Sequence, residues 1–90
     1  MPADAWRLPE RLTLSTVAAL HREGLARATG IAAFDVSGVR EWDSAGVALI
    51  QSLRAEQRRL NAAVAGVIGD TGRYRALCEA HRLADTGLPA

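Results

Sequence analysis

Apolar residues at the start of the chain alternate with polar ones, which predicts short strands rather than a helix. Leu12 and Leu14 alternate with polar neighbours within residues 11–14, a pattern typical of a half-buried strand. Residues 4–8 predict another short strand, and Pro9 favours a turn or a sheet edge between the two.

Two later segments are continuously apolar, as strands are when a parallel sheet buries both of their faces. Residues 31–36 form the first of these segments, in which Asp35 is the exception, and residues 62–68 form the second. Both segments follow turn-forming residues, Thr29-Gly30 and Asn61 respectively. We therefore expect both to be strands of one parallel sheet.

Three segments between the strands have helical spacing. The first is predicted to begin at Ser15 or Thr16, the second to run from 43–44 to about Leu60, and the third to open at 69–71. The resulting order, β-β-α-β-α-β-α, predicts an α/β fold with right-handed crossovers. Its mixed, mainly parallel sheet should have about four strands, packed by about three helices.

Composition narrows the classes of function. The chain of 90 residues suits one domain, residues 1–90, and its hydrophobic share of 49% fits a soluble globular protein. All 11 basic residues are Arg, yet the net charge is only +1, which disfavours a nucleic-acid partner. No signal-peptide pattern and no apolar run of membrane-spanning length is present, so we expect a cytoplasmic protein that reaches a membrane only through a partner.

Residues suited to catalysis or metal binding are few. Cys78 and His81 are separated by two residues on the predicted third helix, but Tyr74 and Leu77 share their face, which favours a place in the core. We therefore expect no catalytic residue, no metal site and no cofactor.

A motif joins the third predicted strand to the second helix. The strand ends in Asp35-Val36-Ser37, and after a short loop the helix opens with Asp43-Ser44-Ala45-Gly46-Val47. Asp43 is placed to cap the helix, and Gly46, which has no Cβ, lets the helix start approach the sheet closely.

This segment resembles the signature of STAS domains, and the chain agrees with that family in the order and spacing of elements from about residue 8 to 83. The resemblance implies a STAS fold and a non-enzymatic, protein-binding role. In STAS anti-sigma-factor antagonists the phosphorylated residue is the second hydroxyl position of the motif, which is Ala45 here. The sequence is closer to MlaB-type STAS subunits of phospholipid-transporting ABC complexes, in which the residue matching Ser44 lies at the contact with the ATPase. Trp42 departs from both groups, which usually have a smaller residue there.

The resemblance implies an ABC-transporter ATPase subunit as partner, at the inner face of the inner membrane, and maintenance of lipid asymmetry as the role. The alternative is an anti-sigma-factor antagonist-like module, bound by a serine kinase or an anti-sigma factor, with Ser44 as a phosphosite.

One face of the second predicted helix is low in charge, which suggests a docking stripe. A helical projection places Ala45, Leu49, Ile50, Leu53 and Leu60 toward the core. The expected partner-binding residues lie on the other side or beside it: Trp42, Asp43, Ser44, Val47, Ala48, Gln51 and Ala55. A solvated face is the alternative, and Trp42 either anchors the interface or covers the core edge.

Overall fold

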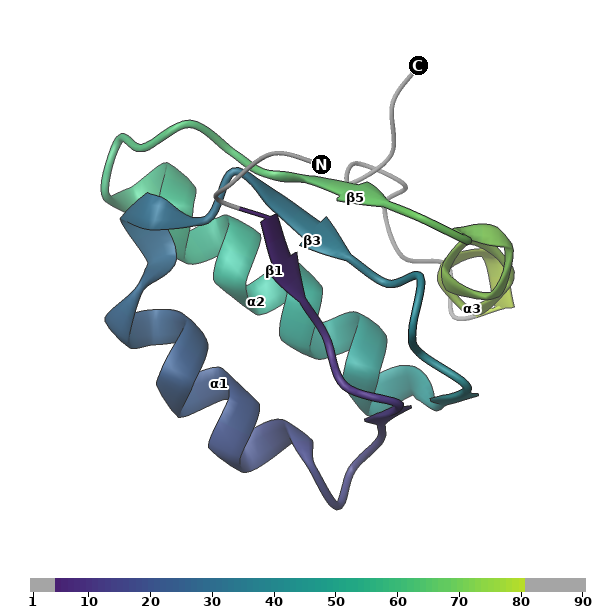
Figure 1. Cartoon of the computed structure of the whole chain (residues 1–90). Coiled ribbons are helices and arrows are strands. Elements are labelled where there is room, and N and C mark those ends of the chain that lie inside the picture. Colours follow the sequence, from purple (N-terminus) through teal and green to yellow (C-terminus); the bar gives the residue numbers. More distant parts are fainter. Residues whose placement is uncertain (1–4, 81–90) are drawn as a thin grey trace.

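A parallel sheet of three short strands is the centre of the computed structural model, which describes residues 5–80 (Figure 1). The strands are β1 (Ala5–Arg7), β3 (Ala33–Asp35) and β5 (Gly66–Ile68), in the spatial order β1-β3-β5. Two further two-residue strands, β2 (Arg11–Leu12) and β4 (Glu41–Trp42), form a separate parallel pair. The predicted α/β class is thus confirmed, but in place of one mixed sheet of about four strands the described residues form five short strands in two sheets, and all three strand pairings are parallel.

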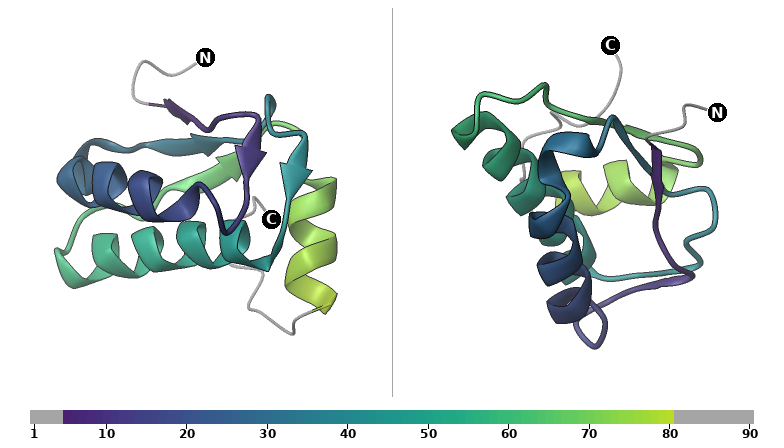
Figure 2. Two further views of the ribbon diagram at one scale, coloured as in Figure 1. Left: turned by 90° about the horizontal axis from the view of Figure 1, so that it is seen from below. Right: turned by 60° about the vertical axis from the view of Figure 1, so that its left-hand side comes forward.

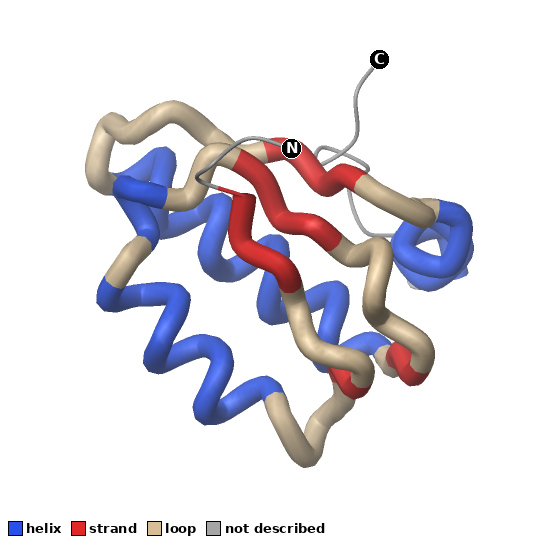
Figure 3. Tube along the Cα trace, viewed as in Figure 1, coloured by secondary structure: helices blue, strands red, loops and turns tan. Residues whose placement is uncertain are grey.

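Three α-helices connect or follow these strands. They are α1 (Val17–Ala26), α2 (Ser44–Arg59) and α3 (Gly72–Ala80), and a short 3-10 helix, η1 (Ala28–Gly30), follows α1. Figure 2 shows α1 and α2 side by side on one face of the sheet, with α3 beside the start of α2. The tube in Figure 3 shows that the loops after β1 and β3 run to the same end of the molecule.

The core lies between the three-stranded sheet and the first two helices. The strand register aligns Trp6, Phe34 and Val67 across the sheet, and all three side chains are buried. Gly24 of α1 allows the helices to approach closely, since a Cβ there would lie 2.5 Å from Cδ1 of Leu53 on α2. Gly24 also leaves room for the large Trp6 ring, whose Cζ3 would lie 2.9 Å from a Cβ at this position.

The second predicted strand is shorter in the structure than the sequence pattern indicates. The alternation over 11–14 predicts that Leu14 continues the strand, but the strand ends at Leu12 and Leu14 is 75% exposed. A turn closes there, because the amide of Thr16 donates to the carbonyl of Thr13 and the Thr13 amide donates to the Thr16 hydroxyl. Thr16 is the N-cap of α1 as predicted, although its side chain serves this turn rather than the helix amides.

Two polar side chains of α2 are buried where the sequence pattern does not predict them. Arg54 Nε donates to the Ala65 carbonyl at 2.8 Å. Gln57 Nε2 donates to the carbonyls of Ala28 and Ile31, at 2.9 and 3.0 Å, and its Oε1 accepts from the Ala65 amide at 2.9 Å. These bonds satisfy backbone groups that would otherwise be buried without partners.

The prediction that Leu60 belongs to the core is wrong. The helix ends at Arg59, and Leu60 is its C-cap. The next residue, Asn61, has a φ of 56°, a left-handed conformation that ends helices. The chain therefore turns away at this point and leaves Leu60 43% exposed.

Replacing Gln57 by Met is expected to lower the free energy of unfolding by about 3 kcal/mol, because it keeps the volume but removes three hydrogen bonds to backbone groups, of which only the Ala28 carbonyl keeps another bond, from the Ile31 amide. Urea denaturation followed by circular dichroism measures this. Gln51→Met is the matched control on the same helix: Gln51 is half-buried and donates to the Tyr74 side chain instead of to backbone groups, so the loss should be smaller, about 1 kcal/mol. Equal losses for the two variants would contradict this account of Gln57.

Candidate functional site

Asp43 fixes the start of α2 and joins it to the loop that precedes α1. Its Oδ1 accepts from the amides of Ala45 and Gly46, at 2.9 and 3.3 Å. Its Oδ2 accepts from the amide of Leu14 at 2.9 Å, across 29 residues of sequence. The predicted N-cap is confirmed, and the bond to Leu14 adds a tertiary connection that helix-capping rules do not reveal.

Gly46 places the first turn of α2 directly against strand β2. A Cβ at this position would overlap the carbonyl oxygen of Leu12 and approach its side chain to 2.9 Å. The predicted close approach of helix and strand is therefore confirmed, and its partner is the short β2–β4 pair.

Removing the Asp43 carboxylate is expected to destabilise the fold by about 2 kcal/mol in Asp43→Ala, because the cap and the Leu14 bond are lost together. Asp43→Asn keeps one acceptor oxygen, so it should retain the cap and lose the Leu14 bond. The loss in the free energy of unfolding should then be about half of that in Asp43→Ala. Thermal and urea denaturation of the three proteins measures the difference. Equal stability of the Ala and Asn variants would show that the second oxygen contributes nothing.

Three residues of the predicted docking stripe are exposed, as expected: Ser44, Ala48 and Ala55. The prediction that Val47 binds the partner is wrong, because its side chain is 0% exposed and packs in the core, where no partner reaches it. Gln51 is half-buried and turns toward α3, where its Nε2 donates to the Tyr74 hydroxyl at 2.9 Å. The exposed stripe is therefore narrower than the sequence predicts.

The side chain of Trp42 packs against the core. It is half-buried, and its ring centroid lies 6.0 Å from that of Tyr74 on α3, in a tilted arrangement. Burial, followed by the neighbouring Cys78, raises the pKa of the Tyr74 hydroxyl. Of the two interpretations of Trp42, the structure favours a side chain that covers the core edge.

The face of α3 that carries Cys78 belongs to the core. Tyr74 and Cys78 are buried and Leu77 is half-buried against them, as the helical spacing predicts. His81, the second residue of the Cys-x-x-His pair, lies outside the described residues. Within residues 5–80, no group of three or more His, Cys, Asp or Glu side chains is placed to hold a metal ion.

A shallow apolar groove between α1 and α2 adjoins the stripe, and the sequence analysis missed it. Its volume is about 310 Å³, and it is lined by Val17, Ala18, His21, Ala45, Ala48, Leu49 and Ser52. His21 Nε2 and Ser52 Oγ lie 3.1 Å apart and bridge the two helices. The small side chains at 18, 45 and 48 leave the groove open, a signal visible in the sequence only once the two helices are known to be neighbours.

Asp35, in the motif at the end of β3, is a buried carboxylate that fixes the following loop. Its Oδ1 accepts from the Ser37 amide at 2.9 Å, whereas its Oδ2 has no hydrogen-bond partner among residues 5–80. The backbone bond from Ser37 lowers the pKa of Asp35 most, the Ser37 side chain lowers it further, burial opposes them, and the charge of Arg7 adds a smaller lowering.

Because the pKa of Asp35 is lower in the folded than in the unfolded chain, ionised Asp35 stabilises the fold at neutral pH. That contribution is fully present above the unfolded pKa of about 4 and is lost as the pH falls through the folded pKa. We expect the free energy of unfolding to fall with pH below about 4 less steeply in Asp35→Asn than in the parent. Urea denaturation from pH 7 to pH 2.5 measures this, and identical pH profiles would contradict it.

The described part of the chain contains no helix long and apolar enough to cross a membrane. A scan against models of protein families gives no match, and a search of curated proteins gives none either. The expectation of a STAS domain thus rests on the resemblance of the motif and on the order of the elements alone.

Proposed function

We propose that the chain is a non-enzymatic STAS subunit that binds a partner protein through the exposed start of α2. The observation that carries this proposal is the set of small and apolar side chains exposed beside that point. Exposed Ser44 and Ala48 adjoin the apolar groove between α1 and α2, and Leu14, 75% exposed, is tied to the same place by its bond to Asp43. Small and apolar side chains allow a partner helix to approach closely.

The partner class that the motif supports is the ATPase subunit of a phospholipid-transporting ABC complex. Asp43-Ser44-Ala45-Gly46-Val47 has the MlaB-type form, and Ser44 is exposed in the first turn of α2, where such a contact would form. In this proposal ATP belongs to the partner and this chain uses no cofactor. The protein works in the cytoplasm, at the inner face of the inner membrane through the transporter complex, and supports lipid asymmetry.

The alternative is a signalling module regulated by a serine kinase, with Ser44 as the phosphosite. The exposure of Ser44 is compatible with it. However, the Asp43 carboxylate already accepts from the amides of Ala45 and Gly46, so a phosphate on Ser44 would meet a neighbouring negative charge instead of free amides. This geometry favours the first proposal.

Ala48→Arg is expected to abolish capture of the partner while leaving the fold intact, because the exposed position tolerates the side chain but a docked helix does not. The measurement is affinity purification of the tagged protein from its native cells, with the co-purified proteins identified by mass spectrometry. Ala76→Arg is the matched control, since Ala76 is also exposed on a helix but lies on α3, away from the stripe.

Recovery of an ABC ATPase with the parent and with Ala76→Arg, but not with Ala48→Arg, supports both the partner and the surface. Recovery of the ATPase with all three proteins would support the ATPase as partner but would contradict the assignment of the docking stripe as its binding surface. A serine kinase or an anti-sigma factor in place of the ATPase overturns the transporter proposal.

A further inference from the structure

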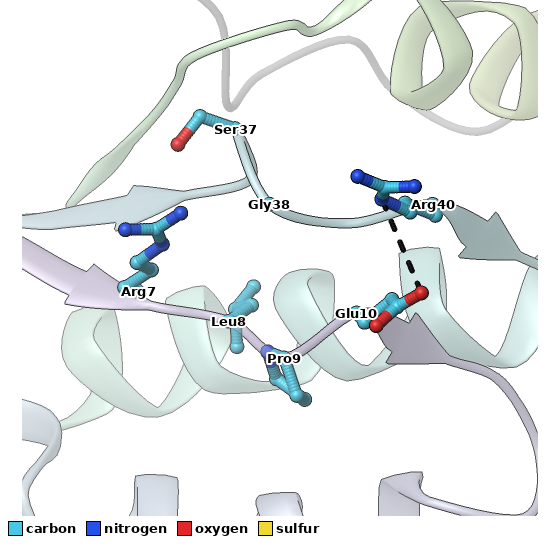
Figure 4. Close-up of a pocket in the computed structure, with 7 residues that line it drawn as sticks. All are labelled: Arg7, Leu8, Pro9, Glu10, Ser37, Gly38 and Arg40. Carbon is cyan, nitrogen blue, oxygen red and sulfur yellow. Dashed lines mark ion pairs between the residues drawn. The ribbon is translucent and has the colours of Figure 1, made fainter.

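A surface depression lies at the carboxyl ends of β1 and β3, apart from the docking stripe (Figure 4). Its volume is about 560 Å³, and it is lined by Arg7, Leu8, Pro9, Glu10, Ser37, Gly38 and Arg40. The segment after β1 forms one wall and the loop after β3 forms the other. In α/β sheets this end of the strands is where ligands bind most often.

Arg7 supplies a positive charge on one side of the depression. Its guanidinium lies across the backbone of Gly38, because a Cβ on Gly38 would be 3.3 Å from both Nε and Nη2 of Arg7. Figure 4 shows the side chain extending from β1 toward the Ser37 loop. Among residues 5–80 Arg7 makes no ion pair, and the carboxylate that its charge affects, Asp35, is buried. The N–H groups at the edge of the Arg7 guanidinium are thus available to a ligand.

Arg40 supplies a second positive charge, farther along the loop. Its Nε lies 4.0 Å from Glu10 Oε1, and both side chains are highly exposed, so the pair is weak. The backbone around it is well fixed, since the Arg40 amide donates to the Glu10 carbonyl at 2.8 Å and the Val39 amide to the Val36 carbonyl at 3.1 Å. The two arginines therefore stand on backbone that the β1 and β3 segments hold in place.

We propose that this depression binds the phosphate group of a small anion between Arg7 and Arg40. Guanidinium groups match the oxygen geometry of phosphate, and Glu10 at the rim weakens the site by its negative charge. The volume leaves room for a group larger than a single phosphate ion, such as a phosphate ester or a lipid headgroup. The site is independent of the partner-binding surface and does not depend on the proposed function.

The test is a titration of the ¹⁵N-labelled full chain with inorganic pyrophosphate at low ionic strength. The amide signals of Gly38 and Arg40 should shift and saturate. Arg7→Gln and Arg40→Gln should each weaken binding about fivefold, and Glu10→Gln should tighten it about threefold. Arg22→Gln is the control: it removes the same charge from the exposed face of α1 and should leave the affinity unchanged.

Co-sedimentation with vesicles distinguishes the two sources of phosphate. Vesicles of phosphatidylcholine are compared with vesicles that also contain phosphatidic acid. Saturable pyrophosphate binding without sedimentation supports a soluble phosphate ester, and sedimentation with phosphatidic acid that Arg7→Gln and Arg40→Gln abolish supports a headgroup. Shifts that do not saturate, or an Arg22→Gln effect equal to the effect of Arg7→Gln, overturn the proposal.

Discussion

The carboxylate of Asp43 holds together the end of the molecule at which both proposed sites lie. One oxygen caps α2, and the other accepts from Leu14, in the turn that precedes α1. A carboxylate at a helix start is stabilised by the free amides and by the helix dipole. Here the same group also sets where the two helices begin relative to each other, and the groove between them depends on that placement. Gly46 completes the arrangement, because only a residue without Cβ fits against the Leu12 carbonyl.

The other end of α2 is fixed by a different means. Arg54 and Gln57 are buried and bond to backbone groups of η1, of the segment before β3 and of the segment before β5. Buried polar side chains of this kind specify one arrangement, since a shifted helix would leave several backbone groups without partners. The helix is thus anchored at both ends, and its middle contributes the apolar contacts of Ile50 and Leu53 to the core.

Charged side chains line the depression after β1 and β3, whereas small and apolar side chains predominate in the groove between α1 and α2. This separation is consistent with two recognition events that use different forces. Packing of small and apolar side chains suits a protein partner at Ala48, and exposed guanidinium groups suit an anion at Arg7 and Arg40. Asp35 contributes indirectly to the depression that Arg7 and Arg40 line, because its bond to the Ser37 amide fixes the start of the loop that carries Arg40.

The α/β class, the Asp43 cap, the glycine at position 46 and the order of the elements, apart from the short strand β4, could be read from the amino-acid pattern alone. The elements and the cap are encoded by neighbours within a few residues, through periodicity and capping chemistry, whereas Gly46 indicates a close approach only by the absence of a side chain, and its partner Leu12 is distant in the chain. Only the tertiary structure decided the burial of Val47 and Gln57 and the exposure of Leu14. A helical projection measures direction around one axis, and it does not show which directions the sheet and the other helices occupy. The α1–α2 groove and the Arg7–Arg40 depression likewise join residues distant in the chain, so they exist only once the strands have paired and the crossovers have closed.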